Sequence, residues 1–252
     1  MPRPVTRRTV LGGAVTGVVA AGLAAGAGTA AASPPGLSFP TTRLARCANA
    51  LIAETQQSFL RNHSLRSFLF ARAAAERQGR RPDEDYDTEL MFLICVLHDM
   101  GLTDEGNTDQ RFEVAGADLA ARFLEANGVT DRRVDTVWDA IALHTTQHLH
   151  GSPVFQRRRP AEIGIAQTGI GIDVTGPDNP DQLPPGFADR VHTHYPRLGG
   201  SRALTEAILE QTIANPLKAP PMTLPGEIRH QRHPSLPYLT WDMILDANSW
   251  AD

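Results

Sequence analysis

An apolar run that ends in a His-Asp pair constrains this chain more than any other feature. Residues 90–97 read Leu-Met-Phe-Leu-Ile-Cys-Val-Leu, and the pair His98-Asp99 follows shortly before Gly101. A run of this length, with polar residues before it and a glycine after it, predicts a helix. Because the run is apolar on nearly every side, we expect other helices to surround it.

The pair His98-Asp99 at the end of such a helix needs a partner. Burial of an imidazole and a carboxylate costs free energy unless something satisfies both groups. A divalent metal ion would do so, because it binds neutral histidine nitrogen and carboxylate oxygen together. In the alternative interpretation, His98 caps the helix C-terminus and Asp99 bonds to nearby backbone. These two residues alone leave both interpretations open.

Helical periodicity extends over most of the rest of the chain. No segment alternates apolar and polar residues in the way that is typical of a half-buried strand. An all-α fold, a compact helical bundle, is therefore predicted. Besides the central run, helical patterns occupy residues 42–52, 63–78, 112–126, 131–144, 162–172, 187–195, 201–214 and 239–248.

The first 32 residues are typical of an export signal rather than of a folded segment. The pair Arg7-Arg8 resembles a twin-arginine signal, although the usual phenylalanine after the pair is missing. An apolar stretch rich in Ala and Gly follows, and Ala30 and Ala32 offer a cleavage point. We therefore predict a secreted, periplasmic or cell-surface protein with no membrane contact after cleavage. A disordered tail or a retained anchor is the alternative.

The remaining chain divides into three parts. A proline-rich joint covers residues 33–40, and a single helical domain covers residues 41–215. Residues 216–252 are expected to form a wrapping loop and then a short helix, because prolines interrupt any helical pattern between residues 219 and 237. We find no internal repeat and no further domain boundary within the bundle.

Charge and cysteine content exclude several classes of protein. Outside the three arginines of the first 32 residues, the chain has 21 basic and 28 acidic residues, and Lys218 is its only lysine. Such a balance argues against a nucleic-acid partner, which needs a basic surface. Two cysteines, Cys47 and Cys95, are too few for a cysteine-rich zinc site. We expect buried free thiols at both positions, with a disulfide between them as the alternative.

Several short phrases resemble the HD-domain superfamily of metal-dependent hydrolases. The ordered residues that carry the likeness are His63 in Asn-His-Ser-Leu-Arg, the doublet His98-Asp99, and Asp173 in Gly-Ile-Asp-Val. Within the superfamily, the chain is most similar to the cyanamide-hydratase-like branch. The resemblance covers residues 42–215, and its further phrases are Leu-His-Asp-Met-Gly-Leu-Thr (97–103), Arg-Phe-Glu-Val-Ala-Gly-Ala-Asp (111–118), Ala-Leu-His-Thr-Thr (142–146) and Tyr-Pro-Arg (195–197).

The resemblance implies that His63, His98, Asp99 and Asp173 bind one divalent metal ion, with water completing the ligand shell. Mixed histidine and carboxylate ligands with an open water position are typical of a catalytic site rather than a structural one. Imidazole and carboxylate ligands suit several metals. We expect zinc as the bound ion, with iron and manganese as alternatives. His144, in the matching phrase Leu-His-Thr, would bind a second metal or face the substrate. The most similar branch has one metal.

Two further residues receive roles on the same basis. Asp99 would bind the metal and also take part in proton transfer from the metal-bound water. Arg66, one helical turn after His63, would neutralise charge on a substrate, and Arg111 could act in the same way. For both arginines, a salt bridge to an acid such as Glu113 is the alternative.

Together these features predict a metal-dependent hydrolase or hydratase that uses a metal-activated water on a small molecule. Cyanamide or a related nitrile is the most specific substrate that the resemblance suggests. A metal-dependent phosphohydrolase acting on nucleotides or phosphoesters is one alternative. A metal-holding binding protein without turnover is the other.

Overall fold

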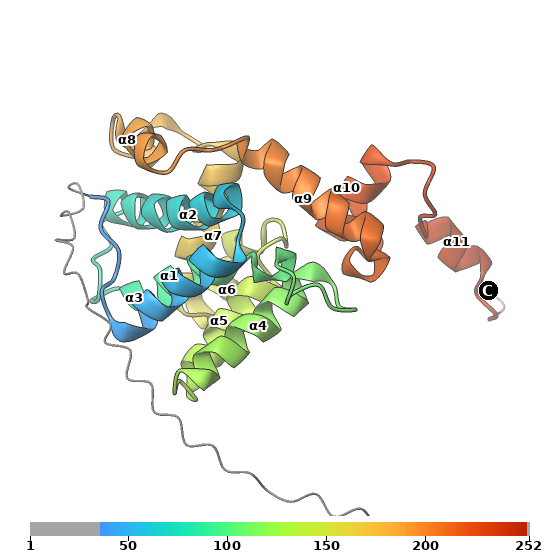
Figure 1. The fold of residues 1–252 in the computed structure, drawn as a ribbon, viewed down its shortest axis with the longest axis horizontal. Helices are drawn as coiled ribbons and strands as arrows, with labels where there is room; N and C mark the ends of the chain where they lie inside the picture. Colours follow the sequence, from blue (N-terminus) through green and yellow to red (C-terminus); the bar gives the residue numbers. More distant parts are fainter. Residues whose placement is uncertain (1–35, 251–252) are drawn as a thin grey trace, which may run out of the picture. The chain divides into compact units, whose positions relative to one another are not determined.

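The computed structural model describes residues 36–250, which fold into α-helices with no β-strand among them, so the predicted all-α class is confirmed (Figure 1). Residues 1–35, with the predicted export signal and the start of the proline-rich joint, lie outside the described residues. None of the described helices is long and apolar enough to cross a membrane. The α-helices are α1 (Arg43–Thr55), α2 (Ser58–Arg77), α3 (Thr88–Leu97), α4 (Phe112–Ala126), α5 (Arg132–Ala142), α6 (Pro153–Arg158), α7 (Ala161–Thr175), α8 (Phe187–His194), α9 (Gly200–Ala214), α10 (Leu224–Arg232) and α11 (Trp241–Asp246).

Helix α3 contains the apolar run and lies at the centre of the core. The side chain of Asp87 accepts a hydrogen bond from the backbone N–H of Leu90, which satisfies one of the free donors at the start of the helix. Every residue from Leu90 to Leu97 is buried. Helices α1, α2, α5 and α7 all pack against α3. The prediction that other helices surround this run is confirmed.

Helices α2 and α7 lie side by side and pack closely (Figure 1). Their close approach depends on Gly169, because a Cβ atom there would lie 2.2 Å from the Ser67 carbonyl oxygen and 2.5 Å from the Ala71 Cβ atom. His63 lies one turn before Ser67 on α2, and Asp173 lies one turn after Gly169 on α7. The glycine contact therefore brings these two side chains together.

One helix boundary differs from the prediction, and two helices were not predicted. Helix α2 begins at Ser58, so His63 lies in its second turn and not at its start. Helices α6 and α10 occupy segments that we expected to be loops. Each has a proline in its first turn, after a Ser152 or Thr223 side chain that caps the helix. Proline breaks a helix interior but is tolerated in the first turn, where its missing N–H has no helical partner to lose.

Candidate metal centre

Three side chains that the sequence analysis singled out meet in the core. His63 comes from α2, while His98 and Asp99 directly follow the last residue of α3. One potential ligand atom from each of the three lies within 4.8 Å of the others, and all three residues are buried. The Nε2 atoms of His63 and His98 are 3.2 Å apart, and Asp99 Oδ2 lies 3.2 Å from His98 Nε2. This group can hold a divalent metal ion.

Hydrogen bonds at the other ring nitrogen fix the orientation of each imidazole. His98 Nδ1 donates to the carbonyl oxygen of Cys95 at 2.8 Å, in the last turn of α3. His144, two residues after α5, donates in the same way to Ile141 at 2.6 Å. Carbonyl oxygens at a helix C-terminus lack helical partners, and they can only accept hydrogen bonds. In the neutral imidazoles, Nε2 therefore carries the free lone pair, and for His98 that lone pair faces the cluster.

The donors fit a divalent metal. Asp99 Oδ2 is buried and accepts no hydrogen bond, although buried carboxylate oxygens are normally paired. The lone pairs of two imidazoles converge on the same place. A cation satisfies all three atoms together, and two histidines with one carboxylate are a known ligand set of catalytic zinc. His63, His98 and Asp99 would hold the ion.

Burial and charge act against each other on the ionisable groups of the centre. Burial alone would lower the pKa of His98, but Asp99, the Cys95 carbonyl and the charge of Asp173 together outweigh it and the pKa is raised. Burial would raise the pKa of Asp99, but the neighbouring histidines hold this pKa well below its usual range. Both shifts show that the centre favours positive charge beside Asp99. A metal ion supplies that charge.

His144 lies at the edge of the cluster. Its Nε2 is 3.8 Å from Asp99 Oδ1, and its side chain is 6% exposed. Burial, with the charge of His98 adding to it, lowers the pKa of His144 to about 4. His144 is therefore neutral near pH 7 and can accept a proton at Nε2.

Comparison with known proteins agrees with this chemistry. The HD domain family matches residues 60–170, which contain the three donors and His144. The chain contains an HD domain over these residues. Two cyanamide hydratases of Saccharomyces cerevisiae, DDI2 and DDI3, are each 29% identical to it over 163 residues, which are 63% of this chain and 68% of each relative. The coarse expectation of a metal-dependent hydrolase of the HD type is confirmed.

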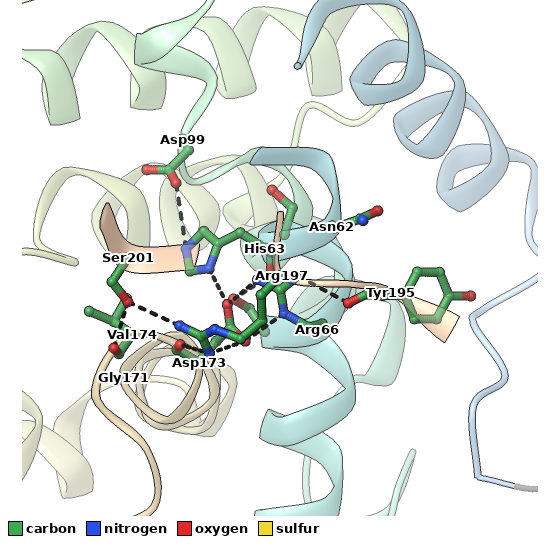
Figure 2. A network of polar contacts seen from close by, with 12 residues as sticks. Asn62, His63, Arg66, Asp99, Gly171, Asp173, Val174, Tyr195, Arg197 and Ser201 are labelled. Atoms are coloured by element: carbon green, nitrogen blue, oxygen red, sulfur yellow. Dashed lines mark hydrogen bonds and ion pairs between the residues drawn. The ribbon is translucent and has the colours of Figure 1, made fainter. Parts of the chain in front are cut away.

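Asp173 lies just beyond the matched HD domain and behind His63, not among the three donors (Figure 2). Both of its carboxylate oxygens bind the Arg66 guanidinium at 2.7 Å, and Oδ2 also accepts from His63 Nδ1 at 2.7 Å. Burial raises the pKa of Asp173, but hydrogen bonds from Arg66 and His63 more than offset this and hold it well below its usual range. In this structure Asp173 is not one of the three grouped donors, and a role as a fourth metal ligand stays a prediction. Asp173 instead orients His63, as outer carboxylates do in many metal sites.

Arg66 has no group free for a substrate. Its side chain is 1% exposed, and its Nη1 donates to the carbonyl oxygens of Tyr195 and Pro196, both at 3.1 Å. Because Nε and Nη2 are taken by Asp173, every guanidinium nitrogen is paired within the protein. The role of Arg66 in neutralising substrate charge stays a prediction, and these contacts give it a different role. It stabilises the carboxylate that orients His63.

The segment that begins with Tyr195 covers this pair from outside (Figure 2). Arg197 Nη1 donates to the Asp173 carbonyl oxygen at 2.8 Å, and Arg197 Nη2 donates to Ser201 Oγ at 3.1 Å. Asn62, next to His63, donates to the Pro196 carbonyl oxygen at 2.9 Å. Tyr-Pro-Arg belongs to the phrases that resemble the HD superfamily, but the sequence alone predicts no role for it. Its role in the structure is to hold the back of the metal centre.

Arg111 forms a salt bridge with Glu113, which was the alternative to a role in neutralising substrate charge. Its Nε donates to Glu113 Oε2 at 3.0 Å, and the hydroxyl of Thr145 donates to the other oxygen of Glu113. Burial raises the pKa of Glu113, but these hydrogen bonds offset it and the pKa is lowered. Since Thr145 directly follows His144, its hydrogen bond to the buried Glu113 carboxylate also anchors His144.

A cavity of about 670 Å³ opens onto the metal centre. His63, His98, Asp99 and His144 line its inner end. Lining residues that the sequence analysis did not single out come from α7, α9 and α10. A substrate in this space would contact the donors directly.

Proposed function

We propose that this HD domain hydrates the carbon–nitrogen triple bond of cyanamide or a related nitrile, with zinc held by His63, His98 and Asp99. The ligand set supports the metal, because two imidazoles and one carboxylate leave a position for water. The likeness to two yeast cyanamide hydratases supports the substrate class.

One observation favours a nitrile over a phosphoester. No arginine or lysine lines the cavity among the described residues. Enzymes that transfer or hydrolyse phosphoryl groups place cations around the phosphate oxygens, because negative charge develops there. Arg66 is fully paired with Asp173 and backbone, and Arg111 is paired with Glu113. The cavity is therefore better suited to an uncharged substrate.

The residues of the centre suit the addition of water. A bound divalent ion lowers the pKa of water toward neutrality, to about 7 in favourable zinc sites. His144 Nε2 is neutral and beside Asp99, so it can accept a proton from the attacking water and return it to the substrate nitrogen. A carbon–oxygen bond forms as one bond of the triple bond breaks, and nitrogen takes up one proton. The second proton then moves from oxygen to nitrogen as the second bond of the triple bond gives way to the carbonyl. Cyanamide would give urea, without oxidant or leaving group.

Elemental analysis of the purified protein, followed by assays of the same sample, tests this proposal. We expect urea from cyanamide, no release of nitrophenol from bis(4-nitrophenyl) phosphate, and loss of urea formation when a chelator removes the metal. Faster turnover of the phosphodiester would favour the phosphohydrolase alternative. A metal-loaded protein that turns over neither compound nor any nitrile would favour the binding protein.

We also propose export through the twin-arginine route. An arginine pair, an apolar stretch and a small-residue site occur in the order that such signals require. Replacement of Arg7 and Arg8 by lysine should leave uncut precursor in the cytoplasm, since the pair is read as arginine and not as charge alone. Arg3→Lys, outside the pair, is the matched control. Normal cutting and export of the double variant would contradict the proposal.

A further inference from the structure

The cavity over the metal centre is much larger than cyanamide. Its volume is about 670 Å³, whereas one water molecule needs only about 10–15 Å³ of such space. Cyanamide is only a few times larger than water, and it would leave most of the cavity filled with solvent. Sites that bind drug-sized molecules typically measure about 300–1,000 Å³. The size of the cavity therefore points to a larger substrate.

Three helices supply an apolar part of the cavity wall. Each helix contributes two aliphatic residues four positions apart, so that both lie on one helix face. Two of these side chains stay well exposed, Val174 at 37% and Leu224 at 41%. An apolar group of a ligand would remove them from water, which is favourable. The residues are Ile170 and Val174 of α7, Leu204 and Ile208 of α9, and Leu224 and Ile228 of α10.

A single unpaired amide stands in this apolar surface. Gln167 of α7 lines the same cavity as the metal donors and is 7% exposed. Neither Nε2 nor Oε1 of Gln167 has a hydrogen-bond partner in the protein. Leaving a buried amide unpaired costs free energy, and such groups are rare in folded proteins. A ligand with one donor and one acceptor close together would satisfy it.

We propose, on the premise of the hydratase function, that the preferred substrate is an N-substituted cyanamide with an apolar substituent. The substituent would lie against α7, α9 and α10, and Gln167 Oε1 would accept a hydrogen bond from the N–H beside the nitrile. Gln167 Nε2 would donate to the oxygen that forms on the nitrile carbon. The reaction adds one water to R–NH–C≡N and gives R–NH–CO–NH₂, so atoms and electrons balance without a further reactant.

Steady-state kinetics of the metal-loaded protein on three compounds test the substrate class. We expect kcat/KM for N-benzylcyanamide to exceed that for cyanamide by about tenfold or more, as one well-filled apolar pocket allows. N-Benzyl-N-methylcyanamide, which lacks the N–H, should be about 10–100-fold poorer than N-benzylcyanamide. Equal or higher kcat/KM for cyanamide would overturn the inference and leave the hydratase function intact.

Variants of the wall and of the amide test the residues. Leu204→Trp should lower the ratio of the two kcat/KM values, benzyl over unsubstituted, by about tenfold, because the indole fills the outer cavity. Ile228→Trp on α10 repeats the test on a separate helix should the first variant fold poorly. Leu217→Trp is the matched control, since Leu217 is 57% exposed and does not line the cavity. An unchanged ratio in well-folded wall variants would contradict the proposed substituent site.

Gln167→Leu should abolish the preference for the N–H compound over its N-methyl analogue. Gln57→Leu is the control, because Gln57 is exposed and makes no side-chain capping hydrogen bond. Binding of the product N-benzylurea is measured by calorimetry on metal-loaded and metal-stripped protein. This measurement tests the ligand class independently of the hydratase function. Binding that weakens in Gln167→Leu, without turnover of any cyanamide, would keep the ligand class and reject the reaction. Absence of binding together with absence of turnover would reject both.

Discussion

The two ring nitrogens of His63 face regions that differ in how completely their polar groups are paired. Behind Nδ1, both oxygens of Asp173 and all three nitrogens of Arg66 form hydrogen bonds. In front of Nε2, Asp99 Oδ2 and both amide atoms of Gln167 are buried without a partner. Buried polar groups that are fully hydrogen-bonded hold side chains in one geometry. Buried polar groups without a partner mark a place where a ligand can supply the missing contact. The back of His63 is therefore scaffold, and the front is the reactive site.

Removal of His98 should have the largest effect, because the metal centre in front of His63 Nε2 loses one of its three donors. We expect His98→Ala to lose its metal and to keep only the activity of the metal-free protein. Helicity should remain, since the apolar helix faces hold the bundle together. Elemental analysis and circular dichroism measure the two effects. His194→Ala is the control, because His194 is exposed but also bonds a backbone carbonyl oxygen through Nδ1. A fully metallated His98→Ala protein would exclude His98 as a ligand.

Loss of His144 should slow turnover and spare the metal. As a proton acceptor, His144 should contribute about 10²–10⁴-fold to kcat. His144→Gln removes the titrating nitrogen, while the three-donor group of His63, His98 and Asp99 stays complete. Turnover and metal content measured on the same sample test this. Loss of metal from the variant would place His144 among the ligands.

Disruption of the Asp173–Arg66 pair behind His63 should mainly lower the free energy of unfolding and, to a smaller extent, the metal affinity. Asp173→Asn keeps the volume but leaves the buried charge of Arg66 without its carboxylate, at a cost of about 3–5 kcal/mol. Metal affinity should fall about 10–100-fold, because His63 loses its orienting partner. Asp139→Asn breaks the exposed pair with Arg159 and should cost at most about 1 kcal/mol. Urea unfolding and a chelator competition titration measure both quantities. Unchanged stability would show that the Arg66 pairing is not structural.

A change at the contact between α2 and α7 should have the smallest effect. Gly169→Ala places a methyl group against the Ser67 carbonyl oxygen and should destabilise the protein by about 1–3 kcal/mol. Gly164→Ala, on the same helix with open space around it, should instead stabilise it by up to about 1 kcal/mol. Thermal unfolding of both variants gives the comparison. Equal effects would show that the close approach is not required.

The sequence predicts the residues near His63 Nε2 better than those near His63 Nδ1. The apolar run and its terminal pair are local signals, so the central helix and the roles considered for His98 and Asp99 follow from them directly. The position of Asp173 depends on Arg66, more than a hundred residues away in sequence, and on the crossing that Gly169 permits. An acid among apolar residues shows that it needs a positive partner, but not whether that partner is a metal or an arginine.

Gln167 and the two missed helices show a second limit. A glutamine within an apolar helix has the same sequence pattern whether its amide is paired or free, and only the fold decides. The prolines between residues 219 and 237 indicate a loop, yet α10 forms there, and α6 likewise begins at a proline. The capping residues Ser152 and Thr223 before them were the signal for a helix start.

The crystal structure of the zinc-loaded protein, with anomalous scattering to locate the ion, tests the central claim most directly. The account predicts zinc within about 2.0–2.2 Å of His63 Nε2, His98 Nε2 and an Asp99 oxygen. Asp173 should keep its contacts with Arg66 and His63 Nδ1. An Asp173 oxygen at ligand distance from the zinc, with Arg66 released, would contradict the division between the two sides of His63.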